Sequence, residues 1–283
     1  MQGYLITNAF MRGGSFETMR NLFMDAAKKQ GVTLISRTNA DFVGAIPAGE
    51  AEFALFYDKD IRLAQRLEMQ GIRVFNSAAA IAVCDDKTLT HLQLQAAAIP
   101  QPEFILCPHT FPGVGYGDMQ FVEKAGDMLG YPMVIKEGCG SFGQQVYLAH
   151  NIMEAKALIA RIGAGPILFQ RFIGECAGHD ERLFVVDGKV IAAIRRESRN
   201  GDFRANIENG GYPVQYTPTR EECDLAVAAC KALGLDFGGV DILPSKDGPL
   251  ICEVNSNAHF GGLMQLTGIN PADHIISHIR RTV

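Results

Sequence analysis

The sequence has no uninterrupted apolar run of the length that crosses a membrane, which argues against a transmembrane protein. Its first residues, Met-Gln-Gly-Tyr-Leu-Ile, also lack the basic segment and apolar stretch that are typical of a cleavable signal. Hydrophobic residues make up 47% of the chain and charged residues 20%, a balance that is typical of a globular protein and not of a disordered one. We therefore expect a soluble, cytoplasmic protein without a membrane partner.

Several functional signatures are also missing. The seven cysteines form no Cys-x-x-Cys pair, so neither a disulfide framework nor a zinc knuckle is indicated, and reduced thiols are expected. A net charge of −5 argues against nonspecific binding to nucleic acid, although it leaves room for a local basic cleft that binds phosphates. Only Gly13-Gly14 follows the first predicted strand, and without Gly-x-Gly-x-x-Gly a dinucleotide-dependent oxidoreductase is not favoured.

The first 80 residues alternate between strand and helix patterns. Strands are predicted at residues 3–7, 32–36, 53–57 and 72–75, and helices at residues 20–30 and 61–70. Because parallel strands are joined through helices, this alternation predicts a small parallel sheet.

A second unit begins after residue 80 and contains a glycine-rich link between two predicted strands. Its predicted strands are residues 103–107, 132–136 and 145–148, and its helices are residues 88–98, 118–129 and 152–162. A strand at residues 166–173 leads into a third unit. The link covers residues 137–143, and Lys136 lies at its mouth. Backbone N–H groups of such a link can hold phosphates while the ammonium group supplies charge, but a glycine-rich hairpin without function fits the pattern too.

The third unit is rich in hairpins. Residues 182–195 form the clearest one, since Asp187-Gly188 suits a type I′ turn, and it brings Arg196 to its far end. A polar loop with Arg204 and Asn206 follows, and helices are predicted at residues 219–233 and 271–281.

A second hairpin, at residues 240–255, carries a possible metal site. Residues 245–248 form its turn, so Asp241 lies on one strand while Glu253 and Asn255 lie on the other. Alternation along the strand places Glu253 and Asn255 on one face. Their oxygens and those of Asp241 suit magnesium, but from spacing alone a polar, solvated face is an equal alternative.

Taken together, these units resemble the ATP-grasp superfamily, and residues 84–280 are most similar to its RimK-type α-L-glutamate ligases. Residues 1–80 resemble the amino-terminal domain of that family in layout only. The motifs that carry the resemblance are Asp86-Lys87, Val134-Ile-Lys136, Gly140-Ser-Phe-Gly143, Gln170-Arg-Phe-Ile173, Gly178-His-Asp-Glu-Arg182, Gly201-Asp-Phe-Arg-Ala-Asn206 with Gly210-Gly211, Gly239-Val-Asp-Ile-Leu243 and Glu253-Val-Asn255.

The resemblance implies ATP and magnesium, usually two ions, with manganese as a substitute. The residues that would bind ATP are Lys87 and Lys136 at the phosphates, Gly140, Ser141 and Gly143 in a lid, Gln170, Arg171, Phe172 and Ile173 at the adenine, and Glu175 or Asp180 at the ribose. Asp241, Glu253 and Asn255 would hold magnesium. Arg196, Arg204 and Asn206 would face the transferred phosphate.

The chain departs from the family pattern in two places. RimK-type sequences continue Glu-x-Asn-x-Ser-Pro-Gly, whereas this chain has Ser-Asn-Ala-His-Phe-Gly-Gly after Asn255. Asn257 and His259 of this tract could contact the substrate or brace the turn. Arg171 stands where an acidic residue is usual, which is harmless if the adenine is bound through the backbone. His274 and His278 have metal-binding spacing, but without a third ligand a solvated helix face is favoured.

The resemblance implies an α/β (α+β) ATP-grasp fold with three domains: a parallel α/β domain at 1–80, a lid domain at 81–168 and a carboxy-terminal antiparallel domain at 169–283. The implied activity is ATP-dependent ligation of an amino acid such as L-glutamate to a small-molecule or peptide carboxylate through an acyl phosphate. Its relatives suggest a homodimer or homotetramer. The alternative is a catalytically inactive ATP-binding scaffold or regulator.

Overall fold

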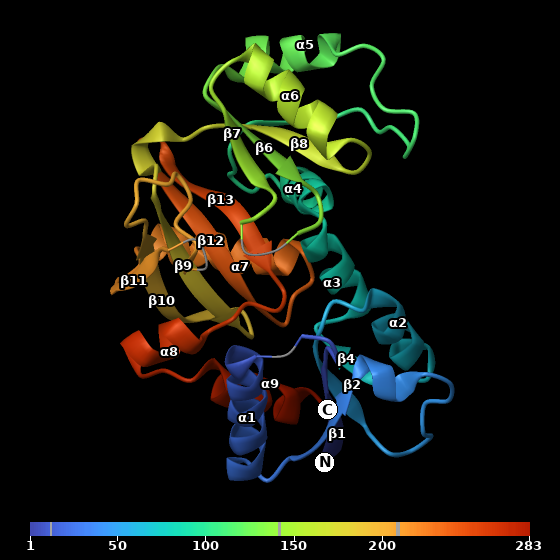
Figure 1. Cartoon of the computed structure of the whole chain (residues 1–283). Helices are drawn as coiled ribbons and strands as arrows, with labels where there is room; N and C mark the ends of the chain where they lie inside the picture. The colour runs from blue at the N-terminus through green and yellow to red at the C-terminus, as the bar shows by residue number, and fades with distance from the viewer. Residues whose placement is uncertain (12, 141–142, 208–209) are drawn as a thin grey trace.

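The computed structural model describes residues 1–11, 13–140, 143–207 and 210–283, so Ser141 of the expected lid lies outside the described residues. Three sheets follow one another along the chain (Figure 1). The second boundary expected from the sequence, between residues 168 and 169, falls inside a strand of the second sheet. The division into domains stays a prediction.

The first sheet is parallel throughout, as the sequence predicted, with the order β2-β1-β3-β4. Helix α1 begins earlier than expected, because Met19 continues the buried face that Phe23 and Ala26 form. The elements of this unit are β1 (Gln2–Thr7), α1 (Gly14–Lys29), β2 (Thr33–Thr38), η1 (Asn39–Phe42), β3 (Phe53–Tyr57), α2 (Ile61–Met69) and β4 (Arg73–Phe75).

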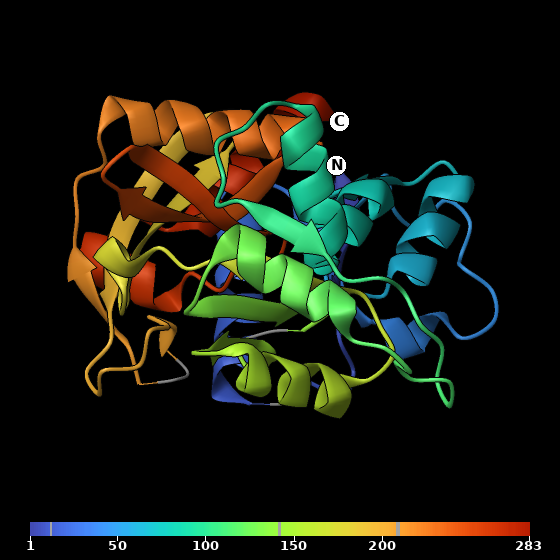
Figure 2. The ribbon, with the colours of Figure 1, turned by 90° about the horizontal axis from the view of Figure 1, so that it is seen from above.

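Two helices lead from the first sheet to the second. The second sheet is antiparallel in the order β5-β8-β6-β7. Helices α5 and α6 cover the outer face of this sheet. Figure 2 shows the two helices from above, in green and yellow-green. The elements are α3 (Ala78–Asp85), α4 (Lys87–Ala96), β5 (Phe104–Leu106), α5 (Gln120–Leu129), β6 (Met133–Glu137), β7 (Val146–Ala149), α6 (Ile152–Ile162) and β8 (Ile167–Arg171).

The third sheet is antiparallel in the order β11-β10-β9-β12-β13. Asp187 and Gly188 have φ of 51° and 66°, the positive values of the expected type I′ turn. Its elements are η2 (Gly174–Cys176), β9 (His179–Val186), β10 (Lys189–Glu197), β11 (Tyr212–Gln215), α7 (Arg220–Ala232), β12 (Phe237–Ser245), β13 (Gly248–Asn255), α8 (Gly261–Thr267) and α9 (Pro271–Thr282). The hairpin of β12 and β13 is the one predicted for the metal site.

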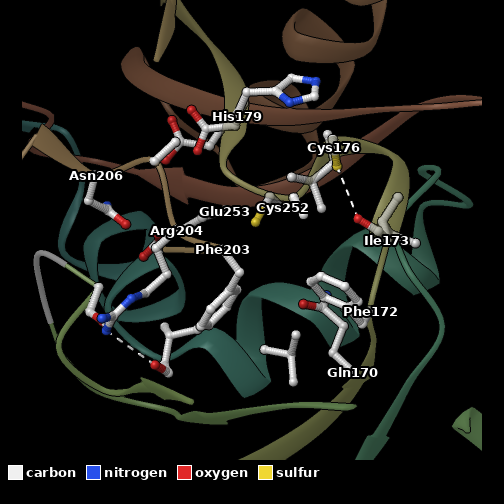
Figure 3. Close-up of a pocket in the computed structure, with 18 of the residues that line it drawn as sticks. Gln170, Phe172, Ile173, Cys176, His179, Phe203, Arg204, Asn206, Cys252 and Glu253 are labelled. Carbon is white, nitrogen blue, oxygen red and sulfur yellow. Dashed lines mark hydrogen bonds between the residues drawn. The ribbon is translucent and has the colours of Figure 1, made fainter. Parts of the chain in front are cut away.

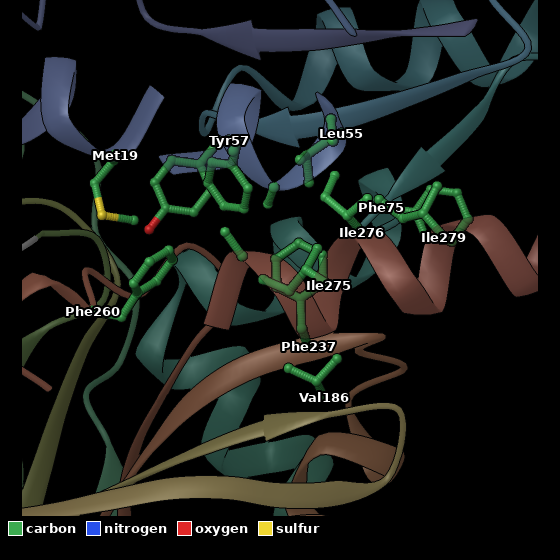
Figure 4. Close-up of a cluster of buried hydrophobic side chains, with 14 of the residues drawn as sticks. Met19, Leu55, Tyr57, Phe75, Val186, Phe237, Phe260, Ile275, Ile276 and Ile279 are labelled. Carbon is green, nitrogen blue, oxygen red and sulfur yellow. The ribbon is translucent and has the colours of Figure 1, made fainter. Parts of the chain in front are cut away.

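An apolar cluster joins the first and third sheets (Figure 4). The ring of Phe260, after β13, packs edge-on against Phe23 of α1 and Phe184 of β9, with centroids 5.7 and 5.6 Å away. Each fully buried phenylalanine contributes about 1.5–3 kcal/mol. The Tyr57 hydroxyl donates to the carbonyl of Ala258 at 2.7 Å, so the end of β3 is held against the chain that follows β13.

Asn76 is a second link between these sheets and has no exposed surface. Its Nδ2 donates to the carbonyls of Phe237 and Ser256 at 2.9 and 3.0 Å. Its Oδ1 accepts from the backbone N–H groups of Asp236 and Phe237 at 2.8 and 3.2 Å. Buried amide atoms are costly unless they are paired, so this residue fixes one relative position of the two units.

The structure bears on three further expectations, which concern the cysteines, membrane-spanning helices and the histidines of α9. All seven cysteine thiols are free, as predicted. Within the described residues, no helix combines the length and apolar character needed to cross a bilayer. The solvated face expected for His274 and His278 is wrong for His278, which is 8% exposed and has its Nε2 2.9 Å from Asp236 Oδ1.

The face of the third sheet beneath α7 contains a buried carboxylate, Glu181 of β9. Its Oε1 accepts from Arg195 Nη2 at 3.0 Å, whereas Oε2 has no hydrogen-bond partner among the described residues. Burial and, after it, the charge of Glu222 raise the pKa of Glu181 to about 7. The folded protein therefore holds a proton on Glu181 between its unfolded pKa of 4.5 and about 7.

Glu181→Gln should change how stability depends on pH. The stability that the extra proton contributes is complete below pH 4.5 and is lost as pH rises through about 7. The free energy of unfolding of the variant relative to wild type should therefore rise by roughly 1–3 kcal/mol between pH 5 and pH 8. Urea denaturation at both pH values measures it. Glu221→Gln, at an exposed position of α7, is the control, and parallel curves for Glu181→Gln and wild type would contradict the prediction.

Candidate active site

Two adjoining cavities meet at the third sheet. The first, of about 90 Å³, lies between the second and third sheets and is shown in Figure 3. The second, of about 360 Å³, is lined by the third sheet and by loops of the first 60 residues. Arg196, Asn206 and Glu253 line both cavities. A ligand in one cavity therefore comes close to a ligand in the other at these three side chains.

Two aromatic rings line the first cavity. Phe172 and Phe203 lie at the same hollow in Figure 3, with ring centroids 6.2 Å apart. Gln170 is 2% exposed, and its Nε2 lies 3.4 Å from Nε2 of the buried His91. Burial, helped by the charge of Lys136, lowers the pKa of His91 to about 3, so the imidazole is neutral at physiological pH. The two rings suit a flat aromatic base.

Two lysines bring positive charge to the first cavity. Lys87, the first residue of α4, is 7% exposed, and its Nζ lies 3.3 Å from the carbonyl of Gly140 and 3.6 Å from Glu253 Oε1. Lys136 of β6 is 4% exposed, and its Nζ donates to the carbonyl of Cys252 at 3.3 Å. Both ammonium groups are largely desolvated, which strengthens their attraction for an anion.

A row of buried charges crosses the third sheet. Strand register places Asp180 opposite Arg196, and Asp241 opposite both Arg182 and Glu253. Asp180 accepts two bonds of 2.6 Å from Arg196, and Asp241 accepts two of 2.7 Å from Arg182. Arg196 Nη2 also lies 2.9 Å from Asp241 Oδ2. Two arginines and two aspartates thus form one interlocked group.

The pKa directions follow from this packing. Burial alone would raise the pKa of Asp241, but Arg182 and Arg196 outweigh it, and the pKa is lowered. For Asp180 burial prevails over Arg196, and its pKa is raised. For Arg196, burial alone would lower the pKa. The charges of Asp180 and Asp241 outweigh burial, and the pKa of Arg196 is raised. The guanidinium group of Arg196 therefore stays charged where the cavities meet.

The loop that contains Arg204 contacts the second sheet. Arg204 is held by Asp202, with Nε and Nη2 at 3.0 and 2.8 Å from the carboxylate. Its Nη1 donates to the carbonyl of Gly143 at 2.7 Å. In Figure 3, Arg204 and Asn206 lie at one end of the first cavity and Phe172 at the other. Arg204 therefore ties the third sheet to the glycine-rich link over this cavity.

Comparison with known proteins identifies the family. A model of the RimK-like ATP-grasp domain matches residues 84–279. The chain belongs to the RimK-like ATP-grasp family. A probable alpha-L-glutamate ligase of Maridesulfovibrio salexigens is 38% identical over 221 residues, which cover 77% of this chain and 70% of that protein. The sequence-based expectation of a carbon–nitrogen ligase of the ATP-grasp kind is confirmed.

Solved structures show the same fold along the whole chain. A RimK-domain ATP-grasp protein of Sphaerobacter thermophilus has a TM-score of 0.76 at 23% identity, and the match covers 98% of each chain. A D-alanine–D-alanine ligase of Bacillus anthracis has a TM-score of 0.77 at 18% identity, covering 100% of this chain and 97% of that one. The α/β ATP-grasp fold expected from the sequence is confirmed.

The residues expected to hold magnesium lie where the two cavities meet. Asp241 and Glu253 are directly opposite each other, and Asn255 pairs with Gly239 two residues along β12. Asn255 Nδ2 is buried without a hydrogen-bond partner among the described residues. Two carboxylates and an amide fit a magnesium ion that takes its other ligands from polyphosphate and water. Since arginines hold both oxygens of Asp241, an ion there would share that carboxylate with them.

The structure gathers most of the ATP-grasp residues expected from the sequence. Thirteen line the first cavity: Lys87, Lys136, Gly143, Gln170, Arg171, Phe172, Ile173, Asp180, Arg196, Arg204, Asn206, Asp241 and Glu253. Asn255, Asn257 and His259 line the second. Gly140 and Glu175 line neither. The side chain of Arg171 pairs with Glu103, so Arg171 offers its backbone to a ligand. Asp180 is held by Arg196, and its role at the ribose stays a prediction.

Sequence reasoning assigned no role to Arg182 or to the first 80 residues. Asp180 and Arg182 are two charges on one face of a largely apolar strand, a pattern that requires opposite charges on neighbouring strands. That pattern could have identified Arg182. The contributions of Phe16, Tyr57 and Asp58 to the second cavity depend on long-range packing, and no local signal points to them.

Arg196→Met should destabilise the fold, because it leaves Asp180 buried without its partner. Loss of one partner of a buried ion pair costs about 3–5 kcal/mol. Urea denaturation should show that loss, and Asp180→Leu combined with Arg196→Met should recover at least half of it. Arg220→Met, which removes an exposed ion pair with Asp224, is the control and should cost less than about 1 kcal/mol. A similarly small loss for Arg196→Met would contradict the interpretation.

Proposed function

We propose that this chain is an ATP- and magnesium-dependent carboxylate–amine ligase that forms an amide through an acyl phosphate and releases ADP and phosphate. The observation that carries the proposal is the junction of the two cavities at Arg196, Asn206 and Glu253. A carboxylate in the second cavity can approach there the terminal phosphate of ATP in the first. In-line approach of two reactants is the main requirement of phosphoryl transfer.

The reaction begins with a poor electrophile. A carboxylate oxygen attacks the γ-phosphorus of ATP, ADP leaves, and the resulting acyl phosphate is then attacked at carbon by an amine with loss of phosphate. Lys87 and Lys136 would neutralise the ATP phosphates, and Phe172 and Phe203 would enclose the base. Arg196 and Asn206 would face both the γ-phosphate and the acyl group. Fixed positive charges of this kind stabilise the transition state without reorganisation.

Asp241, Glu253 and Asn255 would hold magnesium, in two ions as the resemblance implies, with manganese as a substitute. When bound there, the metal would neutralise negative charge on the ATP phosphates. Glu253 is the more accessible carboxylate, since its side chain is 27% exposed and that of Asp241 only 2%.

The lid would protect the acyl phosphate from water. Arg204 connects the loop at residues 201–206 to the carbonyl of Gly143, so its contact would close the first cavity around ATP. Exclusion of water strengthens the electrostatic interactions inside and prevents hydrolysis of the intermediate.

The substrates are proposed from the relatives. Curated relatives are named alpha-L-glutamate ligases, which makes L-glutamate the first amino acid to test, with a small-molecule or peptide carboxylate as its partner. A homodimer or homotetramer in the cytoplasm stays a prediction.

A screen of substrate pairs tests the proposed activity. The protein is incubated with ATP, magnesium, one amino acid and one carboxylate, and phosphate release is followed by mass spectrometry of the product. Phosphate should appear with a matched pair, and the product should be smaller than the sum of the pair by one water. Tight ATP binding without ADP formation across amino-acid and peptide libraries would favour the inactive scaffold instead.

Arg204→Ala should slow turnover by on the order of 100-fold, as the loss of one oxyanion donor does in other enzymes. Initial rates of phosphate release with the matched pair measure this. The control is Arg199→Ala, at an exposed arginine of the same region that stacks on Tyr212 with its guanidinium 4.7 Å from the ring centroid. A near-normal rate for Arg204→Ala would remove this residue from the mechanism.

A further inference from the structure

The second cavity has a buried carboxylate that the proposed mechanism does not use. Asp58 directly follows β3 and is 6% exposed. It accepts hydrogen bonds from Asn8 Nδ2 at 3.1 Å and from the backbone N–H of Lys59 at 2.7 Å. No cationic side chain of the described residues forms an ion pair with it, whereas Asp180 and Asp241 each have an arginine. A buried carboxylate without a cation is costly unless a ligand supplies the charge.

A buried amide oxygen without a hydrogen-bond donor among the described residues lies beside Asp58. Asn257 Nδ2 donates to the carbonyl of Asp58 at 2.7 Å. Because a carbonyl only accepts, this bond fixes the orientation of the amide, and Oδ1 is the other atom. Asn257 Oδ1 is buried and has no hydrogen-bond partner among the described residues. The cavity therefore has a carboxylate and an amide oxygen from adjoining loops, both suited to N–H donors.

The wall around these oxygens is aromatic and firmly held. The ring of His259 lies 5.0 Å from that of Phe16 and 6.3 Å from that of Tyr57, centroid to centroid. The Tyr57 hydroxyl is committed to the carbonyl of Ala258. Aromatic faces attract cations and do not compete with them for hydrogen bonds. The rings of Phe16 and Tyr57 on this wall therefore favour a positively charged group.

Arg182 and Arg196 also line this cavity. Their charges are shared with Asp241 and Asp180, but Arg196 lines the first cavity as well, where the acyl phosphate would form. A carboxylate is drawn toward the arginines and repelled by Asp58. The amine is the other reactant, and at neutral pH it arrives as an ammonium ion. Charge therefore favours the reacting carboxylate near the arginines and the ammonium group near Asp58.

We infer that Asp58, with Asn257 Oδ1, binds the ammonium group of the amine substrate beside the acyl phosphate, where the group loses one proton to solvent and then attacks as the neutral amine. The inference rests on the proposed function and assigns the amine half of the second cavity to residues of the first sheet. Asp58 is thus a specificity-determining residue for the nucleophile. Burial raises the pKa of Asp58, and a bound ammonium would offset that effect.

Asp58→Asn, compared with wild type in two reactions, tests the inference. The first reaction is ligation of the matched pair found in the substrate screen. In the second, hydroxylamine replaces the amine and traps the acyl phosphate as a hydroxamate. Hydroxylamine is small and largely uncharged at neutral pH, so it needs no ammonium site. Loss of a charge-assisted hydrogen bond should raise the KM for the amine roughly 10- to 100-fold in ligation. Hydroxamate formation and the KM for the carboxylate should stay within about threefold.

Asp224→Asn is the matched control, since it removes one negative charge from an exposed position that lines neither cavity. An unchanged KM for the amine in Asp58→Asn would overturn the inference. So would an equal loss of hydroxamate formation, or a raised KM for the carboxylate in place of the amine. Failure of the proposed function looks different, because wild type would then form neither hydroxamate nor amide.

A measurement on wild type covers the case in which Asp58→Asn does not fold. An analogue of the amine substrate with a hydroxyl group in place of the ammonium serves as an inhibitor of hydroxamate formation. The amine substrate is measured as an inhibitor of the same reaction. The inhibition constant of the hydroxyl analogue should be at least tenfold higher than that of the amine. Equal binding of the two compounds would overturn the inference.

Discussion

The structure depends on the interlocked charges of Asp180, Arg182, Arg196 and Asp241 at the centre of the third sheet. The four side chains come from three neighbouring strands, and each pair is set by strand register. Replacement of a buried ion network by apolar residues is often neutral or stabilising, so stability alone does not explain this one. Its position between two cavities does: it fixes two guanidinium groups where negative charge would develop during phosphoryl transfer. Glu253 and Lys87 extend the same alternation of charge into the first cavity.

The rest of the fold places further charged side chains around these four residues of the third sheet. Lys87 begins a helix between the first and second sheets, Lys136 lies on the second sheet, and Arg204 ties that sheet to the third. Asp58 comes from the opposite side, where the packing of Phe23 against Phe260 holds the first sheet in place. All three sheets thus contribute groups to a shared site. The proposed reaction needs all of them, since it brings a polyphosphate, a carboxylate and an amine within reach of one another.

Local sequence patterns predicted most of the elements, whereas the residues expected at the nucleotide came from the resemblance to the ATP-grasp superfamily. Turn residues placed Asp241 on the strand next to that of Glu253 and Asn255, and the structure has these two strands paired. Helix α3 was missed because Ala78–Asp85 is apolar on nearly every side and so has no helical periodicity. Strand β11 was missed because it is short and contains Pro213, which is tolerated at the edge of a sheet. Arg182 and Asp58 required knowledge of register and of packing between distant segments, which local patterns do not contain.

The central claim is that a carboxylate in one cavity meets ATP in the other at Arg196, Asn206 and Glu253. Transfer of oxygen isotope tests this contact most directly. The carboxylate substrate is labelled with ¹⁸O in both oxygens, and the phosphate released during ligation is analysed by mass spectrometry. Direct attack of the carboxylate on the γ-phosphorus should leave one ¹⁸O atom in each phosphate. Unlabelled phosphate, released together with the amide product, would contradict the account.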